Sequence, residues 1–433
     1  MTQRGEHFRF GPVTTEGQTV RFGFTCSRYG SFTEEVTFSS PAPDAPMLLT
    51  LLQVALGVST YKAAAAERVT FPPLTKEGRA MAEALYTEGL AEFFVRADLP
   101  YPPLTKFEGE ILPFMRGEPS GTAAPLVAFG GGKDSYVAGV IVEEADGEAP
   151  AYASVVLSDA VEEVLRRTAP SELLIVRRKL DPELLALKEG FSGHVPITAI
   201  NILILTIEGL LRGSKAVLFA NERSADEPTM SVGGIEANHQ YSKSSAFEVL
   251  VRRAVETAGT EAPLSYSVLR PYSELWIGRA FAGLKEPFGR FTSCNRNFRL
   301  AGDAERRWCG ECAKCAFTSL ILSPFLSREE MLAIFGENFL DRSQLQHFYR
   351  ELVGLSDQKP WDCVGTIAEC RAALFRAGGR DLFAETAAVR DLLPSVLSQE
   401  TEESLRERWA EAMKAEPPGE LPRRYADAGE KLT

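Results

Sequence analysis

Residues 125–135 read Pro125-Leu126-Val127-Ala128-Phe129-Gly130-Gly131-Gly132-Lys133-Asp134-Ser135. The first five form a short apolar run, which predicts a buried strand, and a helix is expected from about residue 134 to 144. The three glycines between them let the backbone turn tightly and bring its N–H groups close to an anion. The positive end of the helix, the Ser135 hydroxyl and the Lys133 ammonium group would strengthen that attraction. The stretch therefore predicts a strand, an anion-binding turn and a helix.

Strand and helix patterns alternate after this turn. Further apolar runs that predict strands lie at residues 153–157, 173–177 and 216–220, with helical stretches between them. Such alternation predicts an α/β fold in which a parallel sheet carries helices on both faces. Ligands of these sheets lie beyond the carboxyl ends of the strands, which is where the glycines are expected.

Composition along the chain divides it into four segments. The first begins with three short alternating runs, which predict a small antiparallel sheet, and helices follow. A stretch rich in Pro and Gly at 100–124 marks the boundary with the second segment. The expected segments are an α+β domain at 1–115, the α/β domain at 120–290, a Cys-containing and helical region at 291–416, and a loose tail at 417–433.

Size and composition narrow the class of protein. A chain of 433 residues predicts two or three domains, and a formal net charge of −12 argues against a nucleic-acid partner. The first ten residues are polar, so we expect no export signal. The most apolar run, 195–211, is short for a membrane span and carries Asn201 and Glu208, which predicts a buried helix and no membrane partner. Seven cysteines, an odd number, suggest thiols or metal ligands and a cytoplasmic location.

Polar clusters follow at three further places. The run at 216–220 is followed by Asn221, Glu222, Arg223 and Ser224, which would lie at the ligand edge of the sheet. A dense set of donors and acceptors comes next, for which a solvated loop with an N-cap at its end is the alternative: Asn238-His239-Gln240-Tyr241-Ser242-Lys243-Ser244. A third stretch, 290–297, offers Arg290 and Arg296, whose forked donors suit carboxylates and phosphates.

Three of the cysteines lie within seven residues. Cys309, Cys312 and Cys315 form two overlapping Cys-x-x-Cys units, a turn that presents thiolates to one metal ion. Cys294 lies upstream and would complete a structural zinc site, although an iron–sulfur cluster or buried free thiols are alternatives. A second unusual stretch, 359–366, combines Pro, Trp, Cys and Gly, and sequence alone offers no physical reason for it.

The spacing of the glycine turn excludes two common nucleotide motifs. A Walker A loop would need Gly where Val127 stands, and a dinucleotide fingerprint would need Gly where Ser135 stands. The turn instead resembles the Ser-Gly-Gly-x-Asp-Ser loop of the PP-loop ATP pyrophosphatases, with Gly130 in place of the first Ser. That resemblance implies an adenine nucleotide alpha hydrolase-like fold that binds ATP through residues 130–135 and delivers AMP to a substrate oxygen. Asp134 would help to hold Mg²⁺.

A closer resemblance covers most of the chain. The chain is similar to the MurL family, the UDP-N-acetylmuramoyl-L-alanyl-L-glutamate epimerases of peptidoglycan synthesis. The matching stretches are residues 57–62, 88–93, 130–135, 221–225, 238–244, 293–295, 308–317 and 359–365. The resemblance implies an ATP- and Mg²⁺-dependent enzyme that inverts the terminal L-glutamate of a UDP-linked muramoyl dipeptide to D-glutamate. AMP and pyrophosphate are the expected products of the nucleotide.

The implied reaction needs a base and an acid on opposite faces of the α-carbon. By residue type the candidates are His239, Tyr241, Cys294 and His194, and the sequence does not choose among them. Asn221, Glu222 and Arg223 are the further residues expected in the catalytic site. Residues expected to bind the substrate are Ser224, Asn238, Lys243, Arg290 and Arg296.

Two other readings fit the turn and the cysteines. A 7-cyano-7-deazaguanine synthase-like enzyme also pairs a PP-loop with zinc-binding cysteines, but the large first segment and the stretch at 238–244 speak against it. A tRNA-modifying sulfur-transfer protein would use the cysteines as carriers, and the net charge of −12 speaks against that.

Overall fold

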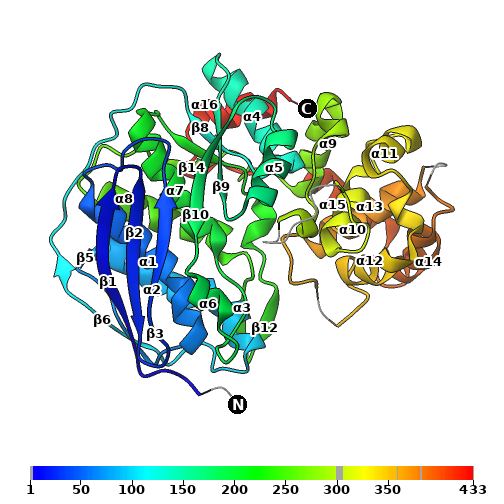
Figure 1. Cartoon of the computed structure of the whole chain (residues 1–433). Helices are drawn as coiled ribbons and strands as arrows, with labels where there is room; N and C mark the ends of the chain where they lie inside the picture. The colour runs from blue at the N-terminus through cyan, green and yellow to red at the C-terminus, as the bar shows by residue number, and fades with distance from the viewer. Residues whose placement is uncertain (1–2, 299–305, 358, 381–382, 433) are drawn as a thin grey trace.

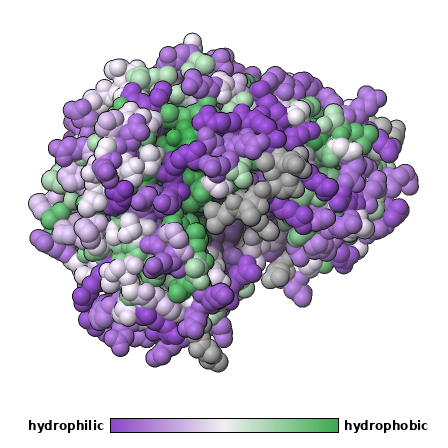
Figure 2. Space-filling model, in the orientation of Figure 1, coloured by the Kyte–Doolittle hydropathy of each residue, from purple (hydrophilic) through white to green (hydrophobic). Residues whose placement is uncertain are grey.

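The computed structural model describes residues 3–298, 306–357, 359–380 and 383–432. Figure 1 shows a sheet-containing part, which holds both halves of a long sheet, beside a smaller helical part built from later residues. Figure 2 shows a mainly hydrophilic surface that is notched between the two parts, beside the elements labelled α3 and β12 in Figure 1.

One half of the ten-stranded sheet is parallel. Its strand order is β14-β11-β8-β9-β10, with every neighbouring pair parallel. The strands are β8 (Leu126–Ala128), β9 (Ala151–Val156), β10 (Leu173–Lys179), β11 (Val217–Phe219) and β14 (Ser265–Ser267). The chain runs from β8 outward to β9 and β10, and then crosses back to β11 on the other side of β8. The carboxyl end of β8 is therefore the point where the strand order reverses, and crevices at such points bind ligands.

The first strands extend the same sheet. They are β1 (His7–Glu16), β2 (Thr19–Cys26), β3 (Gly30–Thr37), β4 (Arg68–Thr70) and β6 (Lys106–Glu108). The hairpins β1–β2 and β2–β3 are antiparallel, as the alternation predicts, but β3 also pairs with β10. A buried ion pair between Glu34 and Arg178, 2.7 Å apart, reinforces that junction. The expected small antiparallel sheet is thus present, but it forms part of the ten-stranded sheet, because β3 pairs with β10.

Helices cover both faces of the sheet. One core contains residues of α1 (Pro46–Ala64), α2 (Lys76–Tyr86), α7 (Ile197–Arg212) and α8 (Ser245–Glu256). The other contains residues of α4 (Lys133–Asp146), α5 (Asp159–Thr168), α9 (Glu274–Leu284) and α16 (Arg423–Glu430). Neighbouring strand residues such as Leu126 and Val127 contribute to opposite cores, as expected for a sheet covered on both sides.

The apolar run at 195–211 is confirmed as a buried helix, α7. Among the described residues, α1 is the helix whose length and composition could suit a membrane span, and 83% of its apolar window is buried inside the protein. The apolar residues of α1 therefore belong to the core of the protein.

The helical part follows the sheet. It contains α10 (Ala313–Leu322), α11 (Arg328–Phe335), α12 (Gln346–Leu352), α13 (Ile367–Gly378), α14 (Ala387–Leu397) and α15 (Glu402–Ala412). The short α-helices and strands not yet named are α3 (Ala91–Arg96), α6 (Pro182–Ala186), β5 (Leu74–Thr75), β7 (Ile111–Leu112), β12 (Met230–Val232) and β13 (Ile235–Ala237).

The end of the chain is not a loose tail. Helix α16 packs against α4, and Tyr425 is fully buried. The Tyr425 hydroxyl donates to Asp146, and the Tyr272 hydroxyl donates to the carbonyl of Ala426 at 3.0 Å. The expectation failed because the buried face of α16, Tyr425, Ala426, Ala428 and Gly429, lies within a mostly polar segment and becomes buried only in the folded chain.

Candidate active site

The glycine loop, residues 130–135, lies at the carboxyl end of β8 and leads into α4. Gly131 has φ +77°, a conformation that glycine adopts without strain, and Gly132 is the N-cap of α4. The Gly130 N–H donates to the Ser135 hydroxyl at 3.0 Å, which closes the turn. The strand, turn and helix expected from the sequence are thus confirmed, and Asp134 lies in the first turn of the helix.

A second segment lies directly against this loop. The Thr292 N–H donates to the Gly131 carbonyl at 2.9 Å, and a Cβ at Gly132 would lie only 2.7 Å from the Ser293 hydroxyl. The turn itself calls for glycine at 131, whereas Gly132 has φ −88° and a side chain there would displace the Ser293 hydroxyl.

Lys133 is a buried residue of the glycine loop. Its side chain is 2% exposed, and its ammonium group pairs with Asp134 at 2.5 Å and with Glu274 at the start of α9. Burial alone would lower the pKa of Lys133, but these two carboxylates raise it, so the lysine stays charged. Burial raises the pKa of Glu274, and the Lys133 ammonium group opposes that shift by favouring the carboxylate. The structure thus places Lys133 in an internal ion pair that joins α4 to α9.

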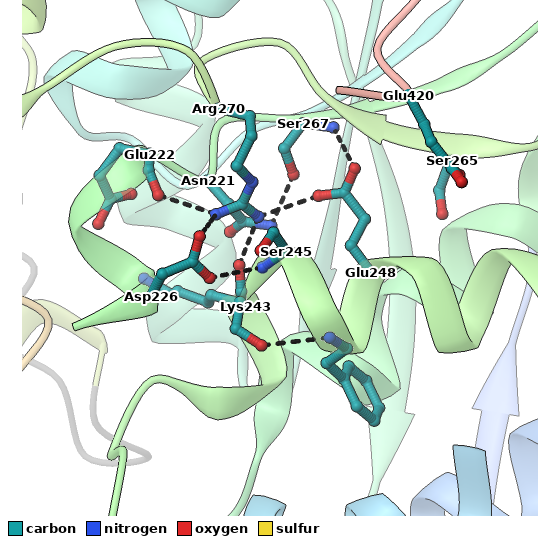
Figure 3. A network of polar contacts seen from close by, with 12 residues as sticks. Asn221, Glu222, Asp226, Lys243, Ser245, Glu248, Ser265, Ser267, Arg270 and Glu420 are labelled. Carbon is teal, nitrogen blue, oxygen red and sulfur yellow. Dashed lines mark hydrogen bonds and ion pairs between the residues drawn. The ribbon is translucent and has the colours of Figure 1, made fainter. Parts of the chain in front are cut away.

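The residues after β11 are held by an arginine that sequence reasoning missed. Arg270 donates to the Glu222 carbonyl at 2.9 Å and to the Lys243 carbonyl at 2.5 Å, and it also pairs with Glu248 (Figure 3). It therefore joins the two polar stretches 221–224 and 238–244. Asn221 is buried and donates to the Ser267 hydroxyl at 2.9 Å.

His239 is the centre of a cluster drawn from distant segments. Its Nδ1 contacts the Glu92 carboxylate at 2.5 Å, and the same oxygen lies 3.3 Å from Nδ1 of His194. The two imidazole rings are 4.6 Å apart between centroids. Burial lowers the pKa of His194 to about 4. Burial also opposes the charge on His239, but Cys363 and Glu92 raise its pKa to about 9.

Cys363 completes this group, which we call the His239 cluster: Glu92, His194, His239, Lys243 and Cys363. Burial alone would raise the pKa of the Cys363 thiol, but the nearby Lys243 ammonium group and His239 imidazole lower it to about 6. Lys243 is buried among negative groups, namely Cys363, Glu222 and Asp134, which keep it protonated against the effect of burial. Lys243 therefore connects the His239 cluster electrostatically with Asp134 of the glycine loop.

The Cys363 segment, residues 359–366, is fixed to the sheet-containing part. Lys359 pairs with Glu227 at 2.7 Å, and Asp362 accepts a hydrogen bond from Asn295 at 2.7 Å. Gly365 packs so closely that a Cβ would lie 3.0 Å from the Phe317 ring and 3.2 Å from Glu274 Cγ. These contacts give physical reasons for Lys359, Asp362 and Gly365 in the stretch that the sequence alone left without one.

The four cysteines expected near one another do meet. Their sulfur atoms all lie within 4.8 Å of one another, with Cys309–Cys315 at 3.8 Å and Cys312–Cys315 at 3.5 Å. A tetrahedral Zn²⁺ with Zn–S bonds of about 2.3 Å places sulfurs about 3.8 Å apart, so these thiols fit a single ion. Cys294 belongs to this thiol cluster, two residues from the Thr292 contact with the glycine loop.

The other expected site residues have structural partners. Arg223 pairs with Glu416 at 2.8 Å, Arg290 with Glu286 at 2.6 Å, and the half-exposed Arg296 with Glu311. Burial raises the pKa of Tyr241 to about 12, so its hydroxyl stays neutral. Asn238 donates to the Ala225 carbonyl at 2.8 Å, and Ser224 donates to Glu222 at 3.3 Å.

Comparison with known proteins matches both parts of the chain. Residues 1–269 match the MurL N-terminal domain, and residues 290–407 match the MurL C-terminal domain. The chain belongs to the MurL family. Among its relatives are proteins named UDP-N-acetyl-alpha-D-muramoyl-L-alanyl-L-glutamate epimerase. The one from a Micromonospora species is 39% identical, over 84% of each chain. Those from Salinispora tropica and Xanthomonas oryzae are 38% and 35% identical, over 93% and 81% of this chain and 90% and 79% of their own.

In this MurL chain, sequence reasoning missed Glu92, Arg270, Glu274 and Cys363. Glu92 and Cys363 lie within the stretches 88–93 and 359–365, which match the family, so the resemblance held a signal for them. Arg270 and Glu274 lie outside all the matching stretches, and only the folded chain reveals their contacts.

Proposed function

We propose that this chain is an ATP-dependent epimerase that inverts the terminal L-glutamate of UDP-N-acetylmuramoyl-L-alanyl-L-glutamate. ATP would be split to AMP and pyrophosphate, and the reaction would take place in the cytoplasm as a step of peptidoglycan precursor synthesis. The main support is the juxtaposition of two sites: the glycine loop at the switch point of the sheet and the His239 cluster, with Lys243 interacting with both. The names of the MurL relatives supply the substrate.

Activation of the carboxylate explains why a nucleotide is needed. The α-hydrogen beside a carboxylate is barely acidic, because its removal would create a dianion. In the proposed first step, a carboxylate oxygen of the terminal glutamate attacks the α-phosphorus of ATP, and the bond to pyrophosphate breaks. The glycine loop would bind the phosphates through backbone N–H groups and the start of α4. Mg²⁺, when bound, would neutralise phosphate charge beside the Asp134 carboxylate.

Inversion then takes place on an activated acyl group. Loss of the α-proton gives an enolate whose charge is shared with the acyl oxygen, and a proton added from the other face inverts the centre. Water must be kept from the adenylate until inversion is complete. Hydrolysis of the adenylate then makes the cycle irreversible, because the two diastereomers would otherwise reach nearly equal amounts.

The thiol cluster would have a structural role in this scheme. Zn²⁺ held by Cys294, Cys309, Cys312 and Cys315 would fix the segment that packs on Gly131 and Gly132. Cys294 would then be a metal ligand and not an acid or base.

Incubation of the protein with ATP, Mg²⁺ and the UDP-linked L-Ala-L-Glu substrate tests the proposal. We expect equal amounts of pyrophosphate and AMP, together with D-glutamate on chiral analysis of the hydrolysed product. Pyrophosphate release only with a tRNA, or only with carboxydeazaguanine, would reject the epimerase and support one of the two alternative PP-loop activities.

A further inference from the structure

Cys363 belongs to the helical part but lies among polar residues of the sheet-containing part. Its segment is anchored on both sides, by Lys359–Glu227 before the cysteine and by the packing of Gly365 after it. Helix α13 continues this anchoring, because Glu369 in its first turn accepts the Glu274 N–H at 2.7 Å. Cys363 is therefore held near His239 and Lys243, and the residue as a whole is partly buried.

The charges around Cys363 favour the thiolate form. Its cationic neighbours are His239, Lys243 and Lys314. Glu92 contacts Nδ1 of the His239 imidazole and balances its charge. The Trp361 ring also lies beside His239, 6.4 Å away between centroids, and limits the space around the pair. A thiolate paired with an imidazolium is a reactive form of cysteine, because the thiolate is the basic and nucleophilic species.

The other candidate bases are less suitable. Cys294 lies in the thiol cluster, and the neutral Tyr241 hydroxyl is a poor base. His194 binds protons too weakly, because burial lowers its pKa to about 4, and His239 already carries a proton near neutral pH. His194 and Cys363 are therefore the groups that are unprotonated near neutral pH, and Cys363, with the higher pKa of about 6, is the stronger base.

We propose that Cys363 is the base that removes the α-proton of the activated glutamyl residue, while His239 stabilises its thiolate. This inference rests on the proposed function and assigns one of its two proton-transfer groups. The Cα–H bond breaks, its electron pair moves into the acyl carbonyl as an enolate, and the proton is transferred to Sγ of Cys363. A second acid, which exchanges its proton with solvent, protonates the α-carbon from the opposite face. The D-product therefore acquires its α-hydrogen from solvent.

Cys363→Ala separates proton transfer from adenylation. In D₂O, wild-type enzyme should form D-glutamate that carries deuterium at the α-carbon. The variant should still release pyrophosphate when the dipeptide substrate is added, within about tenfold of the wild-type rate, because adenylation does not use the thiol. Formation of D-glutamate and deuterium incorporation should fall by about 10²–10⁴-fold, the range for loss of a general base. Cys370→Ala, which removes another buried thiol seven residues away, is the matched control and should keep both activities.

Each outcome decides the inference. D-glutamate formation within tenfold of wild type in Cys363→Ala would overturn it, and so would a folded variant that loses pyrophosphate release as well. If the wild-type protein itself releases no pyrophosphate, the proposed function fails independently. A hydroxylamine-sensitive mass increase on the peptide containing Cys363 would also overturn it, because the thiolate would then form a thioester with the substrate.

Labelling of the wild-type thiol keeps the test valid if Cys363→Ala does not fold. Peptide-level alkylation by iodoacetamide should increase as the pH rises through about 6, the pKa expected for Cys363. His239→Asn should move this increase to higher pH, because the imidazolium that stabilises the thiolate is lost. An unchanged alkylation profile in His239→Asn would contradict the pairing on which the inference depends.

Discussion

The glycine loop and the His239 cluster interact through Lys243, yet they are assembled in different ways. The glycine loop is a continuous stretch, 130–135, and its shape follows from local rules for turns and helix starts. The His239 cluster takes Glu92 from α3, Cys363 from the segment before α13, and its two histidines from loops of the α/β region. The first can thus be recognised from spacing, whereas the second exists only once the chain has folded. A substitution in the loop should therefore stop adenylation, and one in the cluster should stop inversion alone.

Asp134→Asn should have the widest effect, because it removes the first step, on which both measured rates depend. The variant keeps the hydrogen-bonding shape of the side chain but removes the charge that would lie next to Mg²⁺. Pyrophosphate release and D-glutamate formation should both fall, by about 10²–10³-fold, as for loss of other electrostatic stabilisation in active sites. A coupled pyrophosphate assay and chiral analysis measure the two rates.

The control for this variant lies on the same helix. Glu144 is near the other end of α4 and makes an exposed ion pair with Lys431, so Glu144→Gln should behave like wild type. Full pyrophosphate release by Asp134→Asn would show that the glycine loop is not the nucleotide site.

Glu92→Gln should affect inversion and spare adenylation. Loss of the carboxylate removes a partner that raises the pKa of His239 to about 9. We expect D-glutamate formation to fall about 10²-fold, with pyrophosphate release nearly unchanged. The alkaline limb of the pH–rate profile for inversion should move to lower pH, because the imidazolium loses its proton more easily.

The same carboxylate gives a pH signature in stability. Folding raises the pKa of His239 from 6.5 to about 9. The charged imidazolium therefore contributes fully to the free energy of unfolding below pH 6.5, and this contribution is lost as the pH rises through 9. The melting temperatures of wild type and Glu92→Gln should therefore differ most near pH 6 and converge above pH 9. If Glu92→Gln lost pyrophosphate release and D-glutamate formation equally, Glu92 would not act on inversion alone. A difference in melting temperature between wild type and variant that did not change with pH would show that Glu92 does not stabilise the charged His239.

Cys312→Ser tests whether the thiol cluster supports the glycine loop through a metal ion. The purified wild-type protein should contain about one zinc per chain by elemental analysis, and the variant should contain much less. Loss of a structural metal typically lowers the free energy of unfolding by more than about 4 kcal/mol. Activity should fall less than in Asp134→Asn at a temperature where the variant stays folded, because the glycines themselves are intact. If the purified wild-type protein contains no metal and unfolds at the same temperature as Cys312→Ser, the four cysteines do not hold a structural metal ion.

Prediction from sequence succeeded where the pattern is local or repeated. The parallel half of the sheet, its helices, the turn at Gly131 and the meeting of Cys294 with the three later cysteines were all expected and are all present. The junction of β3 with β10 was not, because pairing between distant edges leaves no local pattern. Lys133 was expected at the phosphates, but its buried pairing with Glu274 depends on α9, far along the chain. The apolar face of α16 was hidden in a polar segment for the same reason.

Arg296→Ala should have the smallest effect and tests how far a contiguous motif can be trusted. Residues 290–297 looked like an anion site because two arginines lie close together in the sequence. In the fold, Arg296 is half exposed and pairs with Glu311, outside the set of residues that interact with Lys243. An exposed ion pair contributes only about 0–1 kcal/mol, so the unfolding free energy should barely change. The KM for the UDP-linked dipeptide and the rate of D-glutamate formation should stay near their wild-type values. A large rise in KM alone would instead show that Arg296 leaves Glu311 to bind the substrate. In that case the sequence motif at 290–297 would predict substrate binding better than the ion pairs of the free protein do.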